Sequence, residues 1–507
     1  MNANLYALIE PHFPRAGEPC LILHDGQVVD YDRLASESAR LASVLVDAGC
    51  RPCDRVAVQV DKPWQVLPLY LAVLRAGLVY LPLNSAYQRS ELDYFFGDAA
   101  PRVIVCSPDR LGVIETIARN ATVLTLDAHG GELFDRAQGK GDSFDVVQRA
   151  PDDPASIVYT SGTTGRSKGA ILTHRNLASN ALALVESWGF TRGDVLVHAL
   201  PIYHVHGLFV AIHCVLLSGA RMHWLPRFDA SEVAGLLPRA SVMMGVPTFY
   251  TRLLAEPALD RAACAGMRLF VSGSAPLLPE TFREFESRTG HCILERYGMT
   301  ETGMNTSNPL LGPRKPGTVG MPLPGIAVRV VDAGGEPCAP SAVGEIEIRG
   351  PNVCAGYWNQ PDKTAEAMTP DGWFRSGDLG SIGEDGYLSI SGRAKDMIIS
   401  GGLNIYPKEI EERIDAMPGV VECAVIGVPD SDFGEAVVAV VVPGGGALPS
   451  EAGIVAALKA EIARFKVPRH VYFVAELPRN AMGKVQKNAL RAAHAAGELQ
   501  ALGQPRG

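Results

Sequence analysis

The sequence predicts an α/β protein, with a large N-terminal domain of two α/β subdomains and a small β-barrel-like unit, followed by a small α+β C-terminal domain. Three observations indicate this organisation. Up to about residue 320, apolar strand segments alternate with helical segments, which is typical of parallel sheets with crossover helices. Near residue 320 the pattern changes to short alternating strands between Gly and Pro turns. From about residue 392 helices and strands alternate again over the length of one compact domain.

The N-terminal subdomains begin with an amphipathic helix over residues 31–48, where Leu34, Leu41 and Leu45 recur on one face. A β-branched strand and a second helix follow. The expected elements of this region are a strand at 55–60, a helix at 64–76, apolar segments at 79–83, 103–106, 123–126 and 156–159, and a continuation of the pattern at 195–200, 208–217, 241–246 and 269–272.

The later elements divide into two groups on either side of a domain boundary, which we place between residues 394 and 395. The β unit covers about 320–393, with strands expected at 326–331, 344–348 and 387–390. The C-terminal domain, 395–507, has a helix with Pro near its start and Gly after its end. Its expected elements are that helix at 407–417, strands at 420–428 and 436–442, a helix near 454–465, a strand near 470–474, and an Ala-rich, frayed helix after residue 491.

Composition excludes several classes of protein. The 507 residues carry a net charge of −9, which argues against a general nucleic-acid surface. The N-terminus has neither the basic nor the apolar region of a secretory signal. The most apolar stretches, 208–217 and 436–442, are shorter than the ~18 residues of a membrane span. We therefore expect a cytoplasmic protein with small-molecule substrates and neither nucleic-acid nor membrane partners.

Ten cysteines suggest free thiols in a reducing compartment, because most stand singly and some lie in apolar runs. Cys50 and Cys53 form a C-x-x-C pair, which is compatible with a redox pair or half a zinc site. No second C-x-x-C and no helix follows it, so a loop without this chemistry is the favoured interpretation.

The strongest chemical signal is the segment YTSGTTGRSKG, residues 159–169, which follows a short apolar strand. Glycines allow tight backbone turns, and hydroxyls, backbone N–H groups and a lysine can converge on a phosphate. It is not a Walker loop, because the lysine is followed by glycine. The candidate phosphate-binding residues are Thr160, Ser161, Gly162, Thr163, Thr164, Gly165 and Lys168.

Five further motifs follow in the order found in the adenylate-forming superfamily, which the chain resembles: acyl-CoA synthetases, peptide-synthetase adenylation domains and beetle luciferases. They are SGSAPL (272–277), YGMTE (297–301), RSGD (375–378), GRAKD (392–396) and PRNAMGK (478–484). Three segments resemble the malonyl-CoA synthetases of that superfamily: HALPIYHVHG (198–207), GVPTFY (245–250) and LERYGMTET (294–302).

The resemblance implies a nucleotide site and a mobile C-terminal domain. Asp378 and Arg393 suit the ribose, Tyr297 offers a flat face to adenine, and Thr300 can bind a phosphate oxygen. Glu301 is a hard carboxylate suited to Mg²⁺. The remaining implied residues are the adenine-side Ser274, Ala275, Pro276, Gly298 and Met299, the catalytic Lys484, the hinge Lys395, and Gly401 and Gly402, which approach coenzyme A (CoA).

Arg296 departs from the wider superfamily, where many enzymes of apolar acids have glycine before the motif's tyrosine. A guanidinium there matches a second substrate carboxylate. The resemblance places His206 against the acid, with Val205, Ser272 and Met304 completing the pocket. Two alternatives stay open for the His204-x-His206 pair: zinc chelation through a shared strand face, and half-buried histidines without a ligand.

These resemblances imply an enzyme that joins malonate, with methylmalonate as a second candidate substrate, to CoA with ATP and Mg²⁺, through an acyl-adenylate. Acylation of Lys484 by a modifying enzyme would remove its charge. The alternatives are a CoA ligase of another short acid, an enzyme that loads a carrier-protein thiol, a luciferase-like oxygenase, and a nucleotide sensor without turnover.

Overall fold

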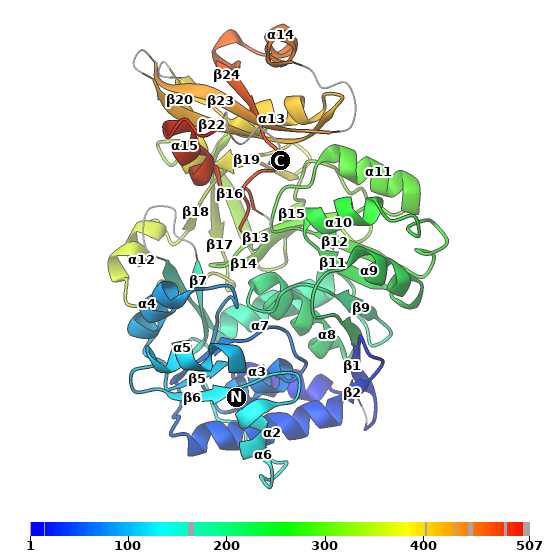
Figure 1. Cartoon of the computed structure of the whole chain (residues 1–507), viewed down its shortest axis with the longest axis vertical. Coiled ribbons are helices and arrows are strands. Elements are labelled where there is room, and N and C mark those ends of the chain that lie inside the picture. The colour runs from blue at the N-terminus through cyan, green and yellow to red at the C-terminus, as the bar shows by residue number, and fades with distance from the viewer. Residues whose placement is uncertain are drawn as a thin grey trace.

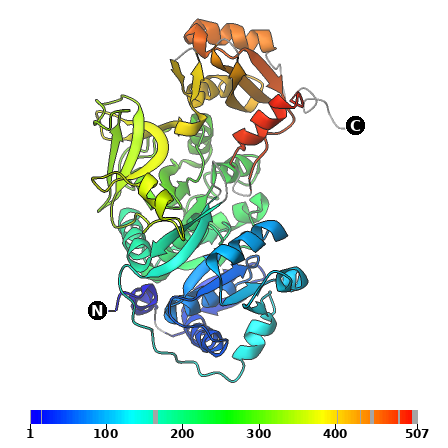
Figure 2. The same ribbon diagram turned by 90° about the vertical axis from the view of Figure 1, so that its left-hand side faces the viewer.

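The computed structural model describes residues 2–14, 16–160, 167–400, 403–430, 433–444, 450–480 and 484–499. It is a mixed α/β structure of several sheets with a separate C-terminal domain, so the predicted fold class is confirmed. The C-terminal domain lies at one end of the long axis, and the first α/β subdomain lies at the other end in both views (Figures 1 and 2).

The first subdomain is a six-stranded sheet in the order β6-β5-β3-β4-β7-β8, parallel except for β8. Helix α3 is buried along its whole length, which explains why its sequence is apolar on every face. The elements are β3 (Arg55–Gln59), β4 (Val79–Pro82), β5 (Val103–Cys106), β6 (Thr122–Thr125), β7 (Pro154–Thr160), β8 (Lys168–Thr173), α2 (Tyr31–Asp47), α3 (Val66–Arg75), α4 (Arg89–Ala99), α5 (Leu111–Glu115) and α6 (Gly131–Ala137).

The second subdomain is a nine-stranded sheet in the order β15-β14-β13-β12-β11-β9-β10-β1-β2, whose six strands from β13 to β1 are parallel. The N-terminal strands β1 and β2, which the sequence pattern did not indicate, join this sheet rather than the first. Its strands are β1 (Pro19–Leu23), β2 (Val28–Asp30), β9 (Val195–His198), β10 (Arg221–Trp224), β11 (Val242–Gly245), β12 (Leu269–Ser272), β13 (Leu294–Met299), β14 (Gly303–Ser307) and β15 (Met321–Pro322).

The helices of this part include one irregular segment. Residues 208–217 are helical, and they divide between a π-helix (His206–Ala211) and α8 (Ile212–Ser218). The other helices of this part are α1 (Leu5–Ile9), α7 (His174–Ser187), α9 (Ala230–Leu236), α10 (Pro247–Leu254) and α11 (Pro279–Thr289), with short 3₁₀ helices at Glu10–His12 and Leu237–Arg239. Elsewhere in the described chain, 3₁₀ helices occur at Pro108–Arg110, Ala394–Asp396 and Arg464–Lys466.

The β unit is a four-stranded antiparallel sheet in the order β16-β17-β18-β19. Three of its strands match the expected ones, whereas β18, which carries Asp378, was not expected. Its elements are β16 (Ala327–Val331), β17 (Gly344–Arg349), β18 (Phe374–Ile382), β19 (Leu388–Arg393) and α12 (Pro361–Ala367).

The C-terminal domain has one sheet with an apolar core on each face. The expected frayed tail helix is instead α15, which begins before residue 491 and packs on the sheet through the buried Leu490. The elements are β20 (Ile398–Ser400), β21 (Leu403–Ile405), β22 (Val420–Asp430), β23 (Gly434–Pro443), β24 (His470–Phe473), α13 (Pro407–Asp415), α14 (Glu451–Glu461) and α15 (Lys487–Ala495).

Both expectations about the cysteines are met. All ten cysteines are free thiols, and Cys50 and Cys53 lie in the loop before β3, as the loop interpretation requires. No helix in the described part of the chain has both the length and the hydropathy needed to cross a bilayer.

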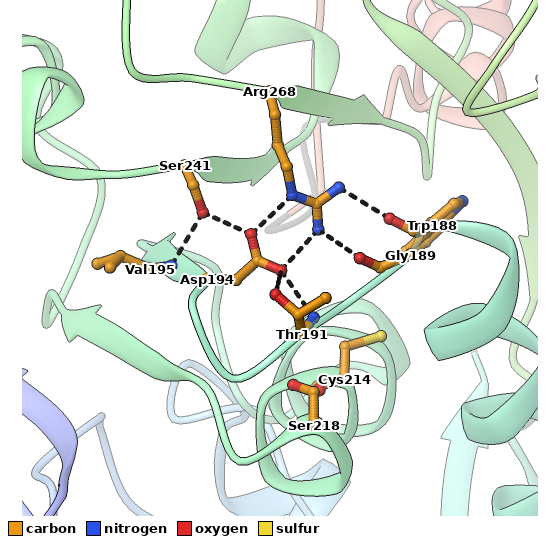
Figure 3. A network of polar contacts seen from close by, with 9 residues as sticks. All are labelled: Trp188, Gly189, Thr191, Asp194, Val195, Cys214, Ser218, Ser241 and Arg268. Atoms are coloured by element: carbon orange, nitrogen blue, oxygen red, sulfur yellow. Dashed lines mark hydrogen bonds and ion pairs between the residues drawn. The ribbon is translucent and has the colours of Figure 1, made fainter.

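A polar network joins the amino ends of three parallel strands of the second sheet (Figure 3). Asp194, just before β9, accepts from Arg268 Nε at 2.7 Å and from Ser241 Oγ at 2.7 Å, and those residues precede β12 and β11. Arg268 also donates to two carbonyls after α7. Because the opposite, carboxyl ends of these strands carry candidate site residues, this network fixes the strands without taking part in the site.

We expect Asp194→Ala to destabilise the protein by about 3 kcal/mol, because it leaves Arg268 without its buried partner. Burial raises the pKa of Asp194, but hydrogen bonds from Arg268 and Ser241 outweigh it and hold the pKa below its usual value. The contribution is therefore complete above the unfolded-state pKa of about 3.9 and is lost as pH falls through the lower folded-state pKa. Urea unfolding of both proteins at pH 7 and in acid measures this difference.

Asp152→Ala is the matched control, because Asp152 forms an exposed ion pair with Arg175 at 2.9 Å and such pairs contribute about 0–1 kcal/mol. Equal destabilisation by the two substitutions would contradict a structural role for the Asp194 network.

Candidate active site

The candidate residues of the second sheet lie at the carboxyl ends of its parallel strands, where open α/β sheets bind ligands. β9 ends at His198, β12 ends at Ser272, and β13 carries Arg296 and Tyr297 toward its end. Of the other residues predicted for the acid pocket, Val205 and His206 lie at the start of the π-helix that follows β9, and Met304 lies on β14.

Arg296 is buried, with 3% of its surface exposed, and its Nε and Nη2 atoms have no hydrogen-bond partner among the described residues. Burial lowers its pKa to about 9, although Tyr250 and Glu295 act in the opposite direction. The guanidinium packs over Gly273, where an added Cβ would lie 2.5 Å from Arg296 Cζ. Because unsatisfied buried donors are costly, this site is suited to an anionic ligand group.

His206 lies beside this guanidinium. Its Nδ1 is 3.3 Å from Ser274 Oγ, and no residue that the structure describes forms a hydrogen bond with its buried Nε2. Burial lowers the pKa of His206, and the charge of Arg296 lowers it further, so the ring is neutral and can donate one hydrogen bond.

The other residues predicted for the acid pocket are also buried. Ser272 is buried, and its hydroxyl has no partner in the described part of the chain; Val205 and Met304 are buried apolar side chains. The pocket therefore combines buried polar groups that lack hydrogen-bond partners among the described residues with an apolar lining.

The prediction that His204 and His206 share one face of a strand, on which the zinc alternative rests, is wrong. His204 and His206 do not lie on a strand, because β9 ends at His198 and the backbone is helical from Val205. No group of three or more metal-binding side chains occurs within the described residues. The 2-residue spacing therefore does not place both rings on one strand face.

The predicted ribose residues form one hydrogen-bonded group across β18 and β19. Asp378 Oδ1 pairs with Arg393 Nε at 2.7 Å, and Tyr297 donates its hydroxyl proton to Asp378 Oδ2. Burial raises the pKa of Asp378 and outweighs the opposing effects of Arg393 and Tyr297. These contacts hold the phenol ring of Tyr297 and the carboxylate of Asp378 next to each other in fixed orientations.

Glu301 lies in the turn after β13 and is buried. The hydroxyl of Tyr357 donates to its Oε1 at 3.1 Å, and Lys168 Nζ lies 4.7 Å from the centre of the Tyr357 ring. No described cation forms an ion pair with Glu301. Sequence reasoning missed Tyr357, and no motif marked it.

The remaining nucleotide candidates follow the strand ends. Thr160 ends β7, Thr300 is half-buried beside Glu301, and Ser274 adopts a left-handed conformation with φ 73°. Ala275 is half-buried and Pro276 is exposed, while Gly298 and Met299 end β13. The predictions for Ser161, Gly162, Thr163, Thr164, Gly165, Gly401 and Gly402 lie outside the described residues.

Lys484 is the residue of the C-terminal domain predicted to act in this site, and its charge interacts with the candidate residues described above. Although part of its surface is exposed, desolvation lowers its pKa, and the positive charge of Arg393 adds to this effect. The carboxylates of Asp378 and Glu301 act in the opposite direction. The lysine charge also lowers the pKa of His204, to about 3, in addition to burial. The ammonium of Lys484 therefore lies within electrostatic range of both predicted ligand sites.

The predicted hinge residue Lys395 is exposed in the 3₁₀ turn Ala394–Asp396, between β19 and β20. The N–H of Met397 closes this turn on the carbonyls of Arg393 and Ala394. One short turn thus connects the last strand of the β unit to the first strand of the C-terminal sheet.

Comparison with known proteins gives consistent results along the chain. The family model described as "AMP-binding enzyme" matches residues 13–358, and "AMP-binding enzyme C-terminal domain" matches residues 409–484. The malonate–CoA ligase of Arabidopsis thaliana is 33% identical over 544 residues, covering 97% of this chain and 89% of that protein. The sulfoacetate–CoA ligase of Cupriavidus necator is 37% identical over 481 residues, covering 93% and 94%.

A solved structure of ATP-bound MatB from Rhodopseudomonas palustris is 53% identical, with a TM-score of 0.95, covering 98% of this chain and 100% of that one. Apo MatB from the same organism is 52% identical with the same coverage, but its TM-score is 0.85. Since identity and coverage are nearly equal, the difference indicates that this chain has an overall arrangement closer to the ATP-bound structure.

Proposed function

Because the chain belongs to the AMP-binding enzyme family and is an AMP-forming acid–CoA ligase that uses ATP and CoA, we propose that its acid is malonate, converted to malonyl-CoA through malonyl-adenylate. The observation that carries this choice is the buried Arg296 guanidinium with two unpartnered nitrogens. A planar fork of buried donors pairs well with the second carboxylate of a dicarboxylic acid.

In the first half-reaction, one malonate carboxylate attacks the α-phosphorus of ATP, an O–P bond forms, and pyrophosphate leaves. Negative charge develops on the phosphoryl oxygens, so the main contribution of the protein is positioning and electrostatic stabilisation. Lys484 supplies a cation to these oxygens. The phosphate loop, including Thr160 and Lys168, holds the leaving pyrophosphate, and Thr300 binds a phosphate oxygen.

The nucleotide lies between the strand ends and the β unit in this proposal. Asp378 accepts from the ribose hydroxyls while Arg393 keeps the carboxylate in place at 2.7 Å. Tyr297 faces the adenine, with the backbone of residues 274–276 on its other side. Met299 and Gly298 continue the wall of this nucleotide site.

Glu301 is the candidate Mg²⁺ ligand. A buried carboxylate without a described ion pair suits a cation that takes one or two carboxylates and substrate phosphates. When bound, Mg²⁺ supplies charge neutralisation at the ATP phosphates. The hydroxyl of Tyr357 holds Glu301 Oε1 at 3.1 Å, so this carboxylate is oriented before ATP arrives.

In the second half-reaction, the CoA thiol attacks the acyl carbon, a C–S bond forms, and AMP leaves. This step requires Lys484 to withdraw, with the C-terminal domain turning at the domain boundary at 394/395. Gly401 and Gly402 then approach the pantetheine chain. Acylation of Lys484 by a modifying enzyme would stop the first half-reaction, and both the exposed surface of this lysine and its lowered pKa favour such a reaction.

We expect Lys395→Pro to slow thioester formation more than adenylate formation, because proline fixes φ near −65° and hinge residues absorb the backbone change between states. The present 3₁₀ turn accommodates this φ, so the first half-reaction is retained. Rapid-quench measurement of both half-rates tests the hinge, and two wild-type rates would show that Lys395 is not the hinge.

The proposed substrate is tested with a panel of acids, each supplied with ATP and CoA: malonate, methylmalonate, sulfoacetate, acetate, butyrate and ferulate. Pyrophosphate release and CoA consumption are both measured. We expect malonate to give the highest kcat/KM, with methylmalonate next. If kcat/KM were higher for sulfoacetate than for malonate, the anion-binding role of Arg296 would stand, but the proposed substrate would be sulfoacetate instead of malonate. Pyrophosphate release without CoA consumption, together with thioester formation when a carrier protein is supplied instead of CoA, would replace CoA as the acceptor.

A further inference from the structure

Lys62 is a buried lysine outside the residues assigned above, and it lies where the two sheets meet. It follows β3 of the first sheet, whereas its partners end β9 and β10 of the second sheet. Its Nζ is 2.7 Å from His198 Nδ1 and 2.8 Å from the carbonyl of His198. It also lies 4.5 Å from the centre of the Trp224 ring.

No described carboxylate pairs with Lys62, although only 6% of its surface is exposed. Burial lowers its pKa well below the usual value, so the amine is held here at a cost in free energy. Because a buried amine without an ion pair is costly, we expect its hydrogen bonds to His198 to position that residue rather than only to support packing.

The tautomer of His198 follows from its partners. Its Nε2 lies 2.9 Å from the carbonyl oxygen of Gly207, which can only accept, so Nε2 carries the proton. Nδ1 is then an acceptor, and Lys62 is the donor to it. Trp224 stacks on this imidazole at 5.1 Å and donates its Nε1–H to the carbonyl of Lys62 at 3.1 Å. The ring of His198 is thus fixed in position and in tautomer.

Gly207 is the point where this hydrogen-bond chain reaches the acid pocket. It follows His206 in the first turn of the π-helix, a rare structure that often occurs at functional sites. An added Cβ at Gly207 would lie 2.0 Å from the carbonyl oxygen of Pro201, so the loop 199–207 closes tightly on itself. The carbonyl that His198 holds therefore lies one residue from the His206 ring and two from Val205.

From this geometry we infer that Lys62 is a positioning residue for the acid pocket: through His198 and the carbonyl of Gly207, it holds His206 where the ring contacts the acid. The inference rests on the proposed function only in that the pocket binds the acid. The inference assigns Lys62 no contact with the acid, ATP or CoA. It acts from the first sheet on a loop of the second.

The test is Lys62→Met, which preserves the length of the side chain and removes the donor. A misplacement of about 1 Å can reduce catalysis about 100-fold. We expect KM for the acid to rise about 10–100-fold, with KM for ATP and for CoA changed less than about 2-fold. The acid used is the one for which the wild-type enzyme has the highest kcat/KM in the panel. A wrong malonate assignment would therefore already appear with the wild-type enzyme and would not affect the outcome of this test.

The matched control is Tyr70→Phe. Tyr70 OH lies 2.8 Å from His213 Nε2, both residues are buried, and His213 is on α8, which continues the π-helix. This substitution also removes a buried hydrogen bond to a histidine, but that bond is not one of the hydrogen bonds that connect Lys62 through His198 to the Gly207 carbonyl. We expect a lower melting temperature with an unchanged KM for the acid.

A double-mutant cycle with His206→Ala distinguishes positioning from a general loss of packing. If Lys62 acts through His206, Lys62→Met adds less than about 2-fold to the loss in the His206→Ala background. Full additivity of the two losses would overturn the proposal, as would a wild-type acid KM in Lys62→Met or equal rises for acid and ATP.

Two substitutions at His198 give a readout if Lys62→Met does not fold. Gln keeps a donor at the position of Nε2, and Leu removes it. The proposal expects His198→Gln to keep KM for the acid within about 5-fold of wild type, and His198→Leu to raise it about 10–100-fold. Equal KM values in the two variants would contradict the hydrogen-bond chain.

Discussion

Lys484→Ala is expected to lower the rate of adenylate formation about 10²–10³-fold while leaving thioester formation from supplied malonyl-adenylate within about 2-fold of wild type. The expected magnitude is that of removing one preorganised charge stabiliser from a transition state. In this structure the ammonium lies in electrostatic range of Asp378 and Glu301, on the nucleotide side of the site. In the second half-reaction the C-terminal domain has withdrawn this lysine from the site, so the loss of its ammonium does not affect that rate.

The measurement is single-turnover pyrophosphate release for the first half-reaction and CoA consumption with synthetic malonyl-adenylate for the second. Lys487→Ala is the matched control, because this lysine lies nearby on α15 and pairs with Glu411 at 2.7 Å. We expect it to leave both half-rates unchanged. An equal loss in both half-reactions of Lys484→Ala would contradict the assigned role.

Arg296→Gly is expected to lower kcat/KM for malonate about 10²–10⁴-fold. Removing one partner of a buried charge pair costs about 3–5 kcal/mol, and each 1.4 kcal/mol corresponds to about tenfold. His206 donates at most one hydrogen bond from the unpartnered Nε2, which cannot replace a guanidinium. Butyrate, which has a methyl group in place of the second carboxylate, loses little or gains, because the substitution removes a charge that its methyl end cannot pair.

Glu295→Gln is the control for this substitution. Glu295 is the preceding residue of β13, is buried, and accepts from the N–H of Leu277, on the side of the strand away from Arg296. Burial raises its pKa to about 7, so glutamine resembles a form that the native side chain already adopts. We expect a change in stability without a change in the preference between acids.

The sequence was most informative where function depends on neighbouring residues. The strand-turn motifs around Ser272 and Tyr297 place their own side chains, and the structure brings them to the carboxyl ends of β12 and β13. The grouping of Asp378, Arg393 and Lys484 spans three distant segments, so only the order of motifs in a known superfamily indicated it.

Other features could not be predicted because they are set by tertiary contacts. The strands β1 and β2 join the second sheet through pairing with β10, which no local pattern reveals. The apolar run after His206 has no period that distinguishes a π-helix from other buried segments. Tyr357 and Lys62 lie outside every motif, and only the fold places them against Glu301 and His198.

The central claim is that Arg296 recognises the second carboxylate of the acid. The most direct test is the ratio of kcat/KM for malonate to that for butyrate, measured in wild type and in Arg296→Gly. The account predicts that the ratio falls at least about 100-fold in the variant, with Glu295→Gln retaining the wild-type ratio. An unchanged ratio in Arg296→Gly would contradict it, since the guanidinium would then have no part in selecting a dicarboxylic acid.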